Sequence, residues 1–236
     1  MTARPPTTPR QNRVLPSGEI VAVAQRGAWL GNRGIVHDGV GEQARVVRLH
    51  RGPLWIICAL QHKDWRLPQW QAHHFTVLFF HDEAVAMAAG HRPCALCRRP
   101  AYNAYRDRWV DANRLFEGRV PRAFEMDRRL HSERLVHRTR IKHIHRRSWW
   151  SLPDGAFVLS DSGPTAGPAL VWGDGVVPWS TEGYADPVDR PLRGTVDVLT
   201  PPSTLGVLRA GYVPQVDPAA GVSARECLEL DADQRG

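Results

Sequence analysis

The chain contains one close pair of cysteines, Cys94-Ala-Leu-Cys97, and this spacing is typical of metal ligands. Two thiolates three positions apart can both reach one ion at about 2.3 Å, and they make half of a tetrahedral zinc site. Pro93 precedes the pair and a predicted helix follows it. Because the N-terminal end of a helix favours negative charge, the thiolate form is favoured here. The pair therefore predicts a metal site, with zinc as the metal.

Other interpretations of the pair stay open. A redox-active C-x-x-C belongs at the strand-to-helix turn of a thioredoxin-like unit, whereas here a helix is predicted before the pair. The two cysteines can also be present without a metal. A zinc deaminase needs a His-x-Glu well upstream of Pro-Cys-x-x-Cys, and His81-Asp-Glu83 lies only about ten residues before the pair. Four cysteines in 236 residues are too few for a disulfide framework.

The residues before the pair extend the pattern. From Phe79 to Arg98 the chain has an aromatic strand, a short Ala-rich helix, a glycine and Arg92-Pro-Cys-x-x-Cys97, in that order. Over these residues, about 20 of the 236, the chain resembles the second half of the Ada-type zinc-binding domain, which repairs DNA phosphotriesters. The resemblance implies a zinc ion held by four ligands, with an expected role in DNA repair.

The upstream half of the site departs from that family. Where the family has a Cys-x-x-x-Cys, this chain has Cys58-Ala-Leu-Gln-His62. Zinc accepts Cys₃His as readily as Cys₄, so Cys58, His62, Cys94 and Cys97 form the expected ligand set. Methyl transfer relies on a thiolate-rich site, and the change to Cys₃His therefore shifts the expected role of zinc from alkyl acceptance to scaffolding. Three other imidazoles are alternatives to His62, namely those of His37, His81 and His91.

Positive charge is concentrated in the middle of the chain. The formal net charge is +7, and the segment from Arg98 to Arg147 holds 15 Arg or Lys against 6 Asp or Glu. Such an excess predicts contact with phosphates, and each phosphate neutralised steepens the salt dependence of binding by about 0.9 log units on duplex DNA. Nucleic acid is the expected partner, DNA rather than RNA. Trp149 and Trp150 are candidates for stacking on bases, and the competing interpretation places tryptophans in the core. The predicted contact residues are Arg98, Arg99, Arg106, Arg134, Arg138, Arg140, Lys142, Arg146 and Arg147.

A carboxylate–imidazole set in the same segment offers a catalytic alternative. On a helix, Asp127 and His131 lie one turn apart on the same face, and a carboxylate that orients an imidazole is the usual arrangement for a general base or a metal ligand. With Glu133 they make a candidate catalytic set for a metal-dependent nuclease or another hydrolase. The competing interpretation is a solvated helix face with charge pairs one turn apart.

The predicted fold class is α+β. Residues 14–80 are rich in strand formers, and strands return after Trp149. Short helices are expected at Glu83–Ala89, with Asp82 as the N-cap, at Pro100–Arg114 and at Pro121–His137. In the second of these, Tyr102, Tyr105, Trp109 and Val110 follow a helical apolar spacing. A flexible arm is expected over residues 1–13, a zinc-binding and basic helical region over 14–148, a β-rich region over 149–225 and a loose acidic tail over 226–236. No apolar run approaches the roughly 20 residues needed to cross a bilayer. The N-terminus has no secretory h-region, so a cytoplasmic protein is expected.

Three functions follow as hypotheses. The first is a nucleic-acid-binding protein associated with DNA repair, in which a structural zinc ion organises a surface rich in arginine. The second is a metal-dependent hydrolase that uses the carboxylate–imidazole set. The third is a globular protein with structural zinc and no nucleic-acid role. Phosphate-binding loops, dinucleotide fingerprints, nucleophile elbows and His-Glu-x-x-His motifs are all absent from the sequence.

Overall fold

The structure is a computed structural model that describes residues 8–112, 119–136, 139, 141–161 and 163–221. It confirms the α+β class. The strands are β1 (Gln11–Val14), β2 (Ile20–Ala22), β3 (Trp29–Asn32), β4 (His37–Asp38), β5 (Arg45–Val46), β6 (Ile56–Cys58), β7 (Leu78–Phe80), β8 (Arg92–Pro93), β9 (His145–Ser148), β10 (Phe157–Ser160), β11 (Gly167–Trp172), β12 (Gly175–Ser180), β13 (Gly183–Tyr184), β14 (Val188–Asp189) and β15 (Thr195–Val198). The helices are α1 (Glu83–Ala88), α2 (Arg99–Ala112), α3 (Ala123–Arg134) and α4 (Pro202–Arg209), with short 3₁₀ turns at Gly41–Gln43, Trp149–Ser151, Gly163–Thr165 and Pro218–Ala220.

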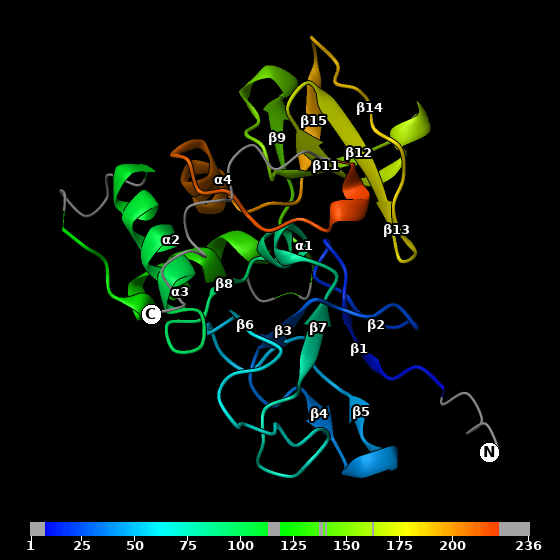
Figure 1. Cartoon of the computed structure of the whole chain (residues 1–236), viewed down its shortest axis with the longest axis vertical. Coiled ribbons are helices and arrows are strands. Elements are labelled where there is room, and N and C mark those ends of the chain that lie inside the picture. Colours follow the sequence, from blue (N-terminus) through cyan, green and yellow to red (C-terminus); the bar gives the residue numbers. More distant parts are fainter. Residues whose placement is uncertain (1–7, 113–118, 137–138, 140, 162, 222–236) are drawn as a thin grey trace.

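Two sheets lie at opposite ends of the molecule, with α1 between them (Figure 1). The N-terminal sheet has the strand order β2-β1-β7-β3-β6-β8. The C-terminal sheet has the order β13-β12-β11-β10-β15-β9, and β14 pairs with β12. Strands β4 and β5 form a separate small sheet at the lower end of Figure 1.

Helix α1 can lie between the sheets because three of its six residues are alanine. All six of its residues are buried. Ala86 and Met87 pack into the core of the N-terminal sheet, while Ala84 and Val85 pack against residues of the C-terminal sheet. The predicted N-cap is confirmed, since the Asp82 carboxylate accepts a hydrogen bond of 2.8 Å from the Val85 backbone N–H. The alanine-rich composition therefore serves close packing on two sides.

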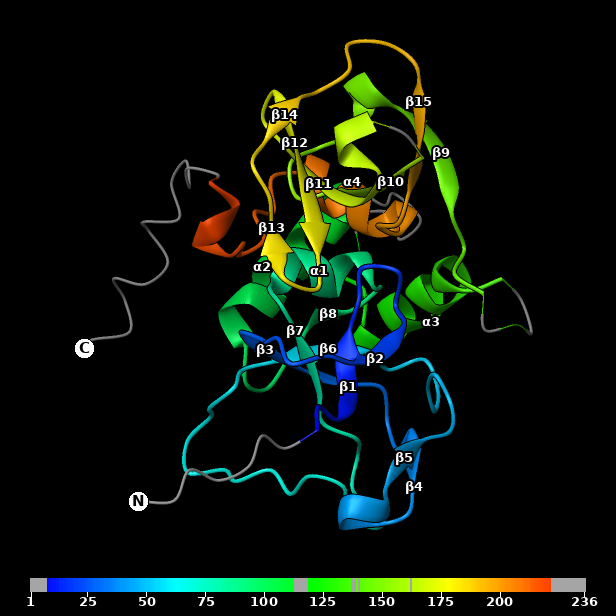
Figure 2. The same cartoon turned by 90° about the vertical axis from the view of Figure 1, so that its right-hand side faces the viewer.

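Helices α2, α3 and α4 pack beside this central layer, and Figure 2 shows the same arrangement after a quarter turn. The apolar spacing predicted for α2 is confirmed, because Tyr102, Tyr105 and Trp109 are all buried. Helix α3 is shorter than predicted. It begins at Ala123, where the Glu125 carboxylate accepts from the Arg122 backbone N–H, and it ends at Arg134. The backbone at Leu135 is extended, so the predicted continuation to residue 137 is wrong.

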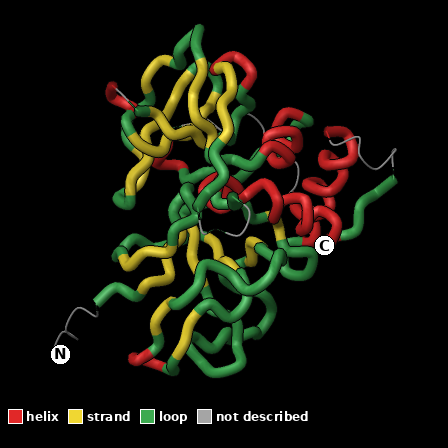
Figure 3. Tube along the Cα trace, turned by 180° about the vertical axis from the view of Figure 1, so that it is seen from behind, coloured by secondary structure: helices red, strands yellow, loops and turns green. Residues whose placement is uncertain are grey.

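The observed organisation differs from the predicted regions at two boundaries. Gln11–Val14 forms β1 inside the N-terminal sheet, so the last residues of the expected arm belong to the fold. Strand β9 pairs with β15, so the C-terminal sheet begins before residue 149 rather than at it. The sheets and helices of both parts are visible together from behind in Figure 3. Within the described ranges, none of the helices has the length and apolar character to cross a membrane.

Candidate metal centre

Parallel pairing of β6 with β8 brings the lone upstream cysteine to the C-x-x-C pair. Ile56 pairs with Arg92 and Ile57 with Pro93, so the next residues along both strands are Cys58 and Cys94. The Cys94 backbone N–H continues the pairing and donates to the Ile57 carbonyl at 2.9 Å. Cysteines 36 positions apart in the sequence thus become neighbours through sheet register.

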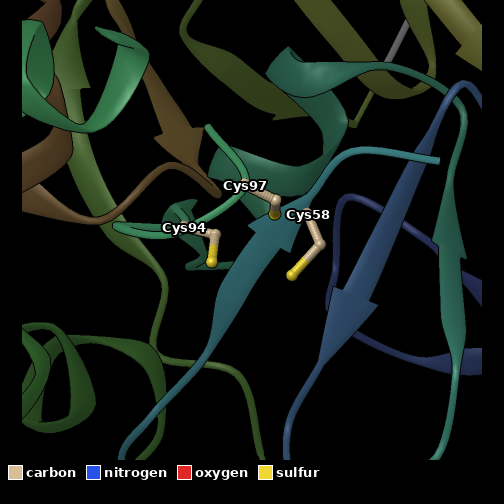
Figure 4. A group of neighbouring side chains, drawn as sticks. All are labelled: Cys58, Cys94 and Cys97. Atoms are coloured by element: carbon tan, nitrogen blue, oxygen red, sulfur yellow. The ribbon is translucent and has the colours of Figure 1, made fainter. Parts of the chain in front are cut away.

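The three sulfur atoms of Cys58, Cys94 and Cys97 all lie within 4.8 Å of one another and gather around the end of β6 (Figure 4). Backbone amides support two of them. Leu96 N–H donates to Cys94 Sγ and Ala59 N–H donates to Cys97 Sγ, each at 3.4 Å. The expected Cys₃ part of the ligand set is therefore brought together, and this group can hold a metal ion.

The electrostatics of the group couple the thiols to one another. Hydrogen bonds from Cys58 and then Cys97 lower the pKa of Cys94, whereas the hydrogen bond to Cys94 is the main factor that raises the pKa of Cys58. Helix α2 starts at Arg99, directly after the pair, and its N-terminal end also favours negative charge on the sulfurs. The cluster thus favours at least one thiolate.

One face of the N-terminal sheet carries a pocket of about 340 Å³ whose wall includes all three cysteines. Because side chains alternate along a strand, every second residue points into it. The sheet contributes Leu30 and Asn32 from β3, Ile56 and Cys58 from β6, and Phe75, Val77 and Phe79 from the run through β7. The opposite face, with Ile57, Leu78 and Phe80, packs into the core. The strand runs Leu54–Cys58 and Phe75–Phe80 are apolar at nearly every position, so the sequence does not distinguish the pocket face from the core face.

The segment 59–69 covers the pocket and keeps it largely apolar. Leu60, Trp65 and Leu67 line it from this side, and Leu60 and Trp65 are half-exposed at the surface. Leu96, between the two ligand cysteines, is 55% exposed and also lines the pocket. The sulfurs are thus reached through an apolar opening.

The fourth predicted ligand is not part of the sulfur group. His62 lines the pocket and packs edge-on against Trp65, with ring centroids 5.2 Å apart. Its ring nitrogens, however, do not lie within 4.8 Å of all three sulfur atoms. Sequence spacing could not place it, because its position depends on the course of the 59–69 segment. In the part of the chain that the structure describes, no fourth His, Cys, Asp or Glu joins the three cysteines.

The three alternative imidazoles are also engaged elsewhere. His91 is fully buried, accepts from Arg33 Nε at 3.0 Å and pairs through Nδ1 with the Ala86 carbonyl. His81 contacts the side chains of Gln25 and Asp217, and His37 contacts Thr76. The fourth cysteine, Cys227, lies outside the described residues.

The predicted catalytic set does not converge on a site. Both oxygens of Asp127 accept from Arg92, at 2.9 and 2.8 Å, and both side chains are buried. Glu133 accepts from Ser203 and from Arg129. His131 instead packs against the His50 ring at 4.9 Å, and its Nδ1 is buried without a hydrogen-bond partner. The expected orientation of His131 by Asp127 is therefore wrong, because Arg92 takes both carboxylate oxygens.

Three of the predicted phosphate contacts point into the protein. Arg98 is buried, pairs with Glu83 at 2.8 Å and stacks on Trp29. Arg134 is fully buried at the end of α3, and the Lys142 ammonium donates to the Ala88 carbonyl at 2.5 Å. The prediction that these three side chains contact phosphates at the surface is therefore wrong, because their partners lie inside the protein.

The other predicted phosphate contacts differ in whether they form an ion pair. Arg106 pairs with Asp107, and Arg146 pairs with Asp197. Arg99 and Arg147 are exposed and form no ion pair with a carboxylate of the described ranges. Arg138 and Arg140 lie outside the described residues.

Comparison of the chain with family models, with curated proteins and with solved structures gave no match. The resemblance to the Ada-type domain consequently rests on its 20 or so residues, and the geometry of the sulfur group carries the functional argument.

Proposed function

We propose that the protein is a zinc protein in which Cys58, Cys94 and Cys97 hold the ion and its fourth coordination position faces the apolar pocket. The observation that carries the proposal is the sulfur group at the wall of the pocket, without a fourth protein ligand among the described residues. Structural zinc sites are closed by four protein ligands, whereas sites that bind or activate a ligand keep one position open.

The donor set fits zinc. Thiolate sulfur is a soft ligand that suits zinc, whereas magnesium and calcium prefer oxygen ligands. A zinc ion at this place would supply a Lewis acid and hold the sulfurs as thiolates. The protein side chains would supply the rest, because Phe79, Leu67 and Trp65 exclude water and accept an apolar molecular body. The proposed ligand is a small molecule that combines an apolar body with one donor atom.

Cobalt substitution tests whether the fourth position is open. Co²⁺ bound by thiolates absorbs visible light, and the spectrum responds to a change in any ligand. We expect imidazole to shift the spectrum of the Co²⁺-loaded protein in a saturable manner, and the His62→Ala variant to show the wild-type spectrum before imidazole is added. A spectrum that changes in His62→Ala and does not respond to imidazole in the wild type would instead establish a closed Cys₃His site.

Nucleic-acid binding is a second proposal, supported by one exposed pair. Trp150 is 78% exposed and lies three residues after Arg147, which is also exposed. An exposed guanidinium suits contact with a phosphate, and an exposed aromatic ring suits a stacked base. The surface is smaller than the nine-residue set predicted from the sequence, because part of that set points inward.

Filter binding against salt concentration measures this second proposal. With duplex DNA, we expect Arg147→Met to reduce the slope of log K against log salt by about 0.9, the value for one lost phosphate contact. Arg119→Met is the matched control, since Arg119 pairs with Glu125 and its replacement changes the net charge equally. A wild-type affinity that does not respond to salt would rule out phosphate contact.

A further inference from the structure

Three cationic side chains lie together at the end of α1, and we call Arg33, Arg134 and Lys142 the cationic cluster. Arg33 and Arg134 are both fully buried. Their guanidinium carbons lie 3.9 and 4.5 Å from the centroid of the Trp55 ring, so they are at most 8.4 Å apart. Lys142 belongs to the same group, because the charges of both arginines act on its ammonium.

Backbone carbonyls satisfy only part of the cationic cluster. Arg134 donates to the carbonyls of Gly90 and Pro53, Lys142 donates to that of Ala88, and Arg33 donates to that of Gly18. Carbonyls at a helix C-terminus carry a partial negative charge of about half a unit, which is small against three cations. The second terminal nitrogen (Nη2) of Arg33 and that of Arg134 are buried without a hydrogen-bond partner.

Carboxylates offset only part of this charge, and only at Arg134. Asp127 and Glu133 act on Arg134 from a distance, but Asp127 binds Arg92, and Glu133 binds Ser203 and Arg129. No acidic group is among the charges that act on Arg33 or Lys142 within the described structure. Burial and then the charges of Arg33 and Arg134 lower the pKa of Lys142 to about 7. Buried cations without a counter-charge are costly, so the binding of an anion here would be favourable.

We propose that the cationic cluster binds a phosphate-type oxyanion, held by the free guanidinium nitrogens of Arg33 and Arg134. Guanidinium groups match the oxygens of phosphate, and the shared contact with the Trp55 ring brings two of them to one place in the fold. Three cations suit a doubly charged oxyanion better than a single carboxylate. The site lies at the start of β6, whereas the sulfur group lies at its end, so this inference is independent of the metal.

An exposed loop lies over the cluster. Residues 51–54 are exposed, and Arg134 bonds directly to the Pro53 carbonyl from beneath this loop. His50 and His131 form the partly exposed edge of the cluster, and the Nδ1 atom of each is buried without a partner. The two rings contact each other edge-on, 4.9 Å between centroids, so they bound the cluster together and each has one ring nitrogen free to donate to an oxyanion beside them.

Calorimetry with inorganic phosphate tests the proposal on the full chain at constant ionic strength. We expect saturable binding of one phosphate, and an affinity about tenfold weaker or more in Lys142→Met, since one charged hydrogen bond is lost. Lys63→Met is the matched control, because Lys63 is exposed and its loss should leave the affinity unchanged. Circular dichroism verifies folding, and His50→Ala, expected to weaken binding severalfold, replaces Lys142→Met if that variant does not fold.

Two further titrations identify the source of the anion. A single-stranded oligonucleotide that competes with phosphate would identify a phosphodiester backbone, and failure to compete would identify a small free phosphate. The proposal is overturned if wild-type protein shows no saturable phosphate binding, if acetate binds as tightly as phosphate, or if the variant and the wild type bind phosphate equally.

Discussion

Replacement of Cys94 by serine is expected to weaken zinc binding by more than about 100-fold, because loss of even an outer partner of a metal ligand costs 10–100-fold. Cys94 has the greatest effect of the three ligands for a structural reason. It is the most buried of them, it shares hydrogen bonds with both other thiols, and its backbone N–H continues the pairing with β6. A serine hydroxyl fits the space but is a poor zinc ligand.

The affinity is measured by competition with a chelator of known zinc affinity. Leu96→Ala is the matched control, since it changes an exposed residue between Cys94 and Cys97 and keeps every sulfur. Equal zinc affinity in Cys94→Ser and the wild type would remove Cys94 from the ligand set. Equal losses of zinc affinity in Cys94→Ser and Leu96→Ala would show that the effect comes from a disturbed backbone between Cys94 and Cys97 and not from a lost ligand.

Replacement of Asp127 by alanine is expected to lower the free energy of unfolding by about 3–5 kcal/mol, the usual cost of breaking a buried ion pair. Asp127 makes two hydrogen bonds to Arg92, and the side chains of the pair are only 5% and 2% exposed. The substitution would leave the Arg92 guanidinium buried without its counter-charge. Arg92 forms β8 with Pro93, so the same change should also weaken the metal site that follows.

Urea denaturation compares this variant with Asp107→Ala. Asp107 pairs with Arg106 at the surface, so its loss should cost less than about 1 kcal/mol. The double variant Arg92→Met/Asp127→Leu should regain most of the stability, because an apolar pair of similar volume removes the buried charge altogether. A loss in Asp127→Ala no larger than that in Asp107→Ala would contradict the structural role given to this pair.

Local features of the sequence predicted the local parts of the site. The Cys94 and Cys97 spacing, the Asp82 cap and the alanine-rich helix all follow from residues within one short segment. Cys58 was predicted as a ligand from the family resemblance, because Cys58-x-x-x-His62 stands where that family has Cys-x-x-x-Cys. Its contact with Cys94 depends on the parallel pairing of β6 and β8. No local pattern encodes that pairing.

The direction of long cationic side chains could not be predicted in the same way. Arg98, Arg134 and Lys142 occur among exposed arginines in the sequence, yet their partners are Glu83, the Gly90 carbonyl and the Ala88 carbonyl. All of these partners lie in or beside α1, which is distant in sequence from Arg134 and Lys142. The density of positive charge in the sequence therefore predicted an exposed surface, whereas the fold directs these three side chains into the protein.

Elemental analysis of the purified wild-type protein tests the central claim most directly. The proposed centre predicts about one zinc ion per chain, with Cys58, Cys94 and Cys97 protected from alkylation while the protein is folded. Protein that contains no zinc, binds none when it is supplied and has all three thiols freely alkylated in the folded state would contradict the proposal.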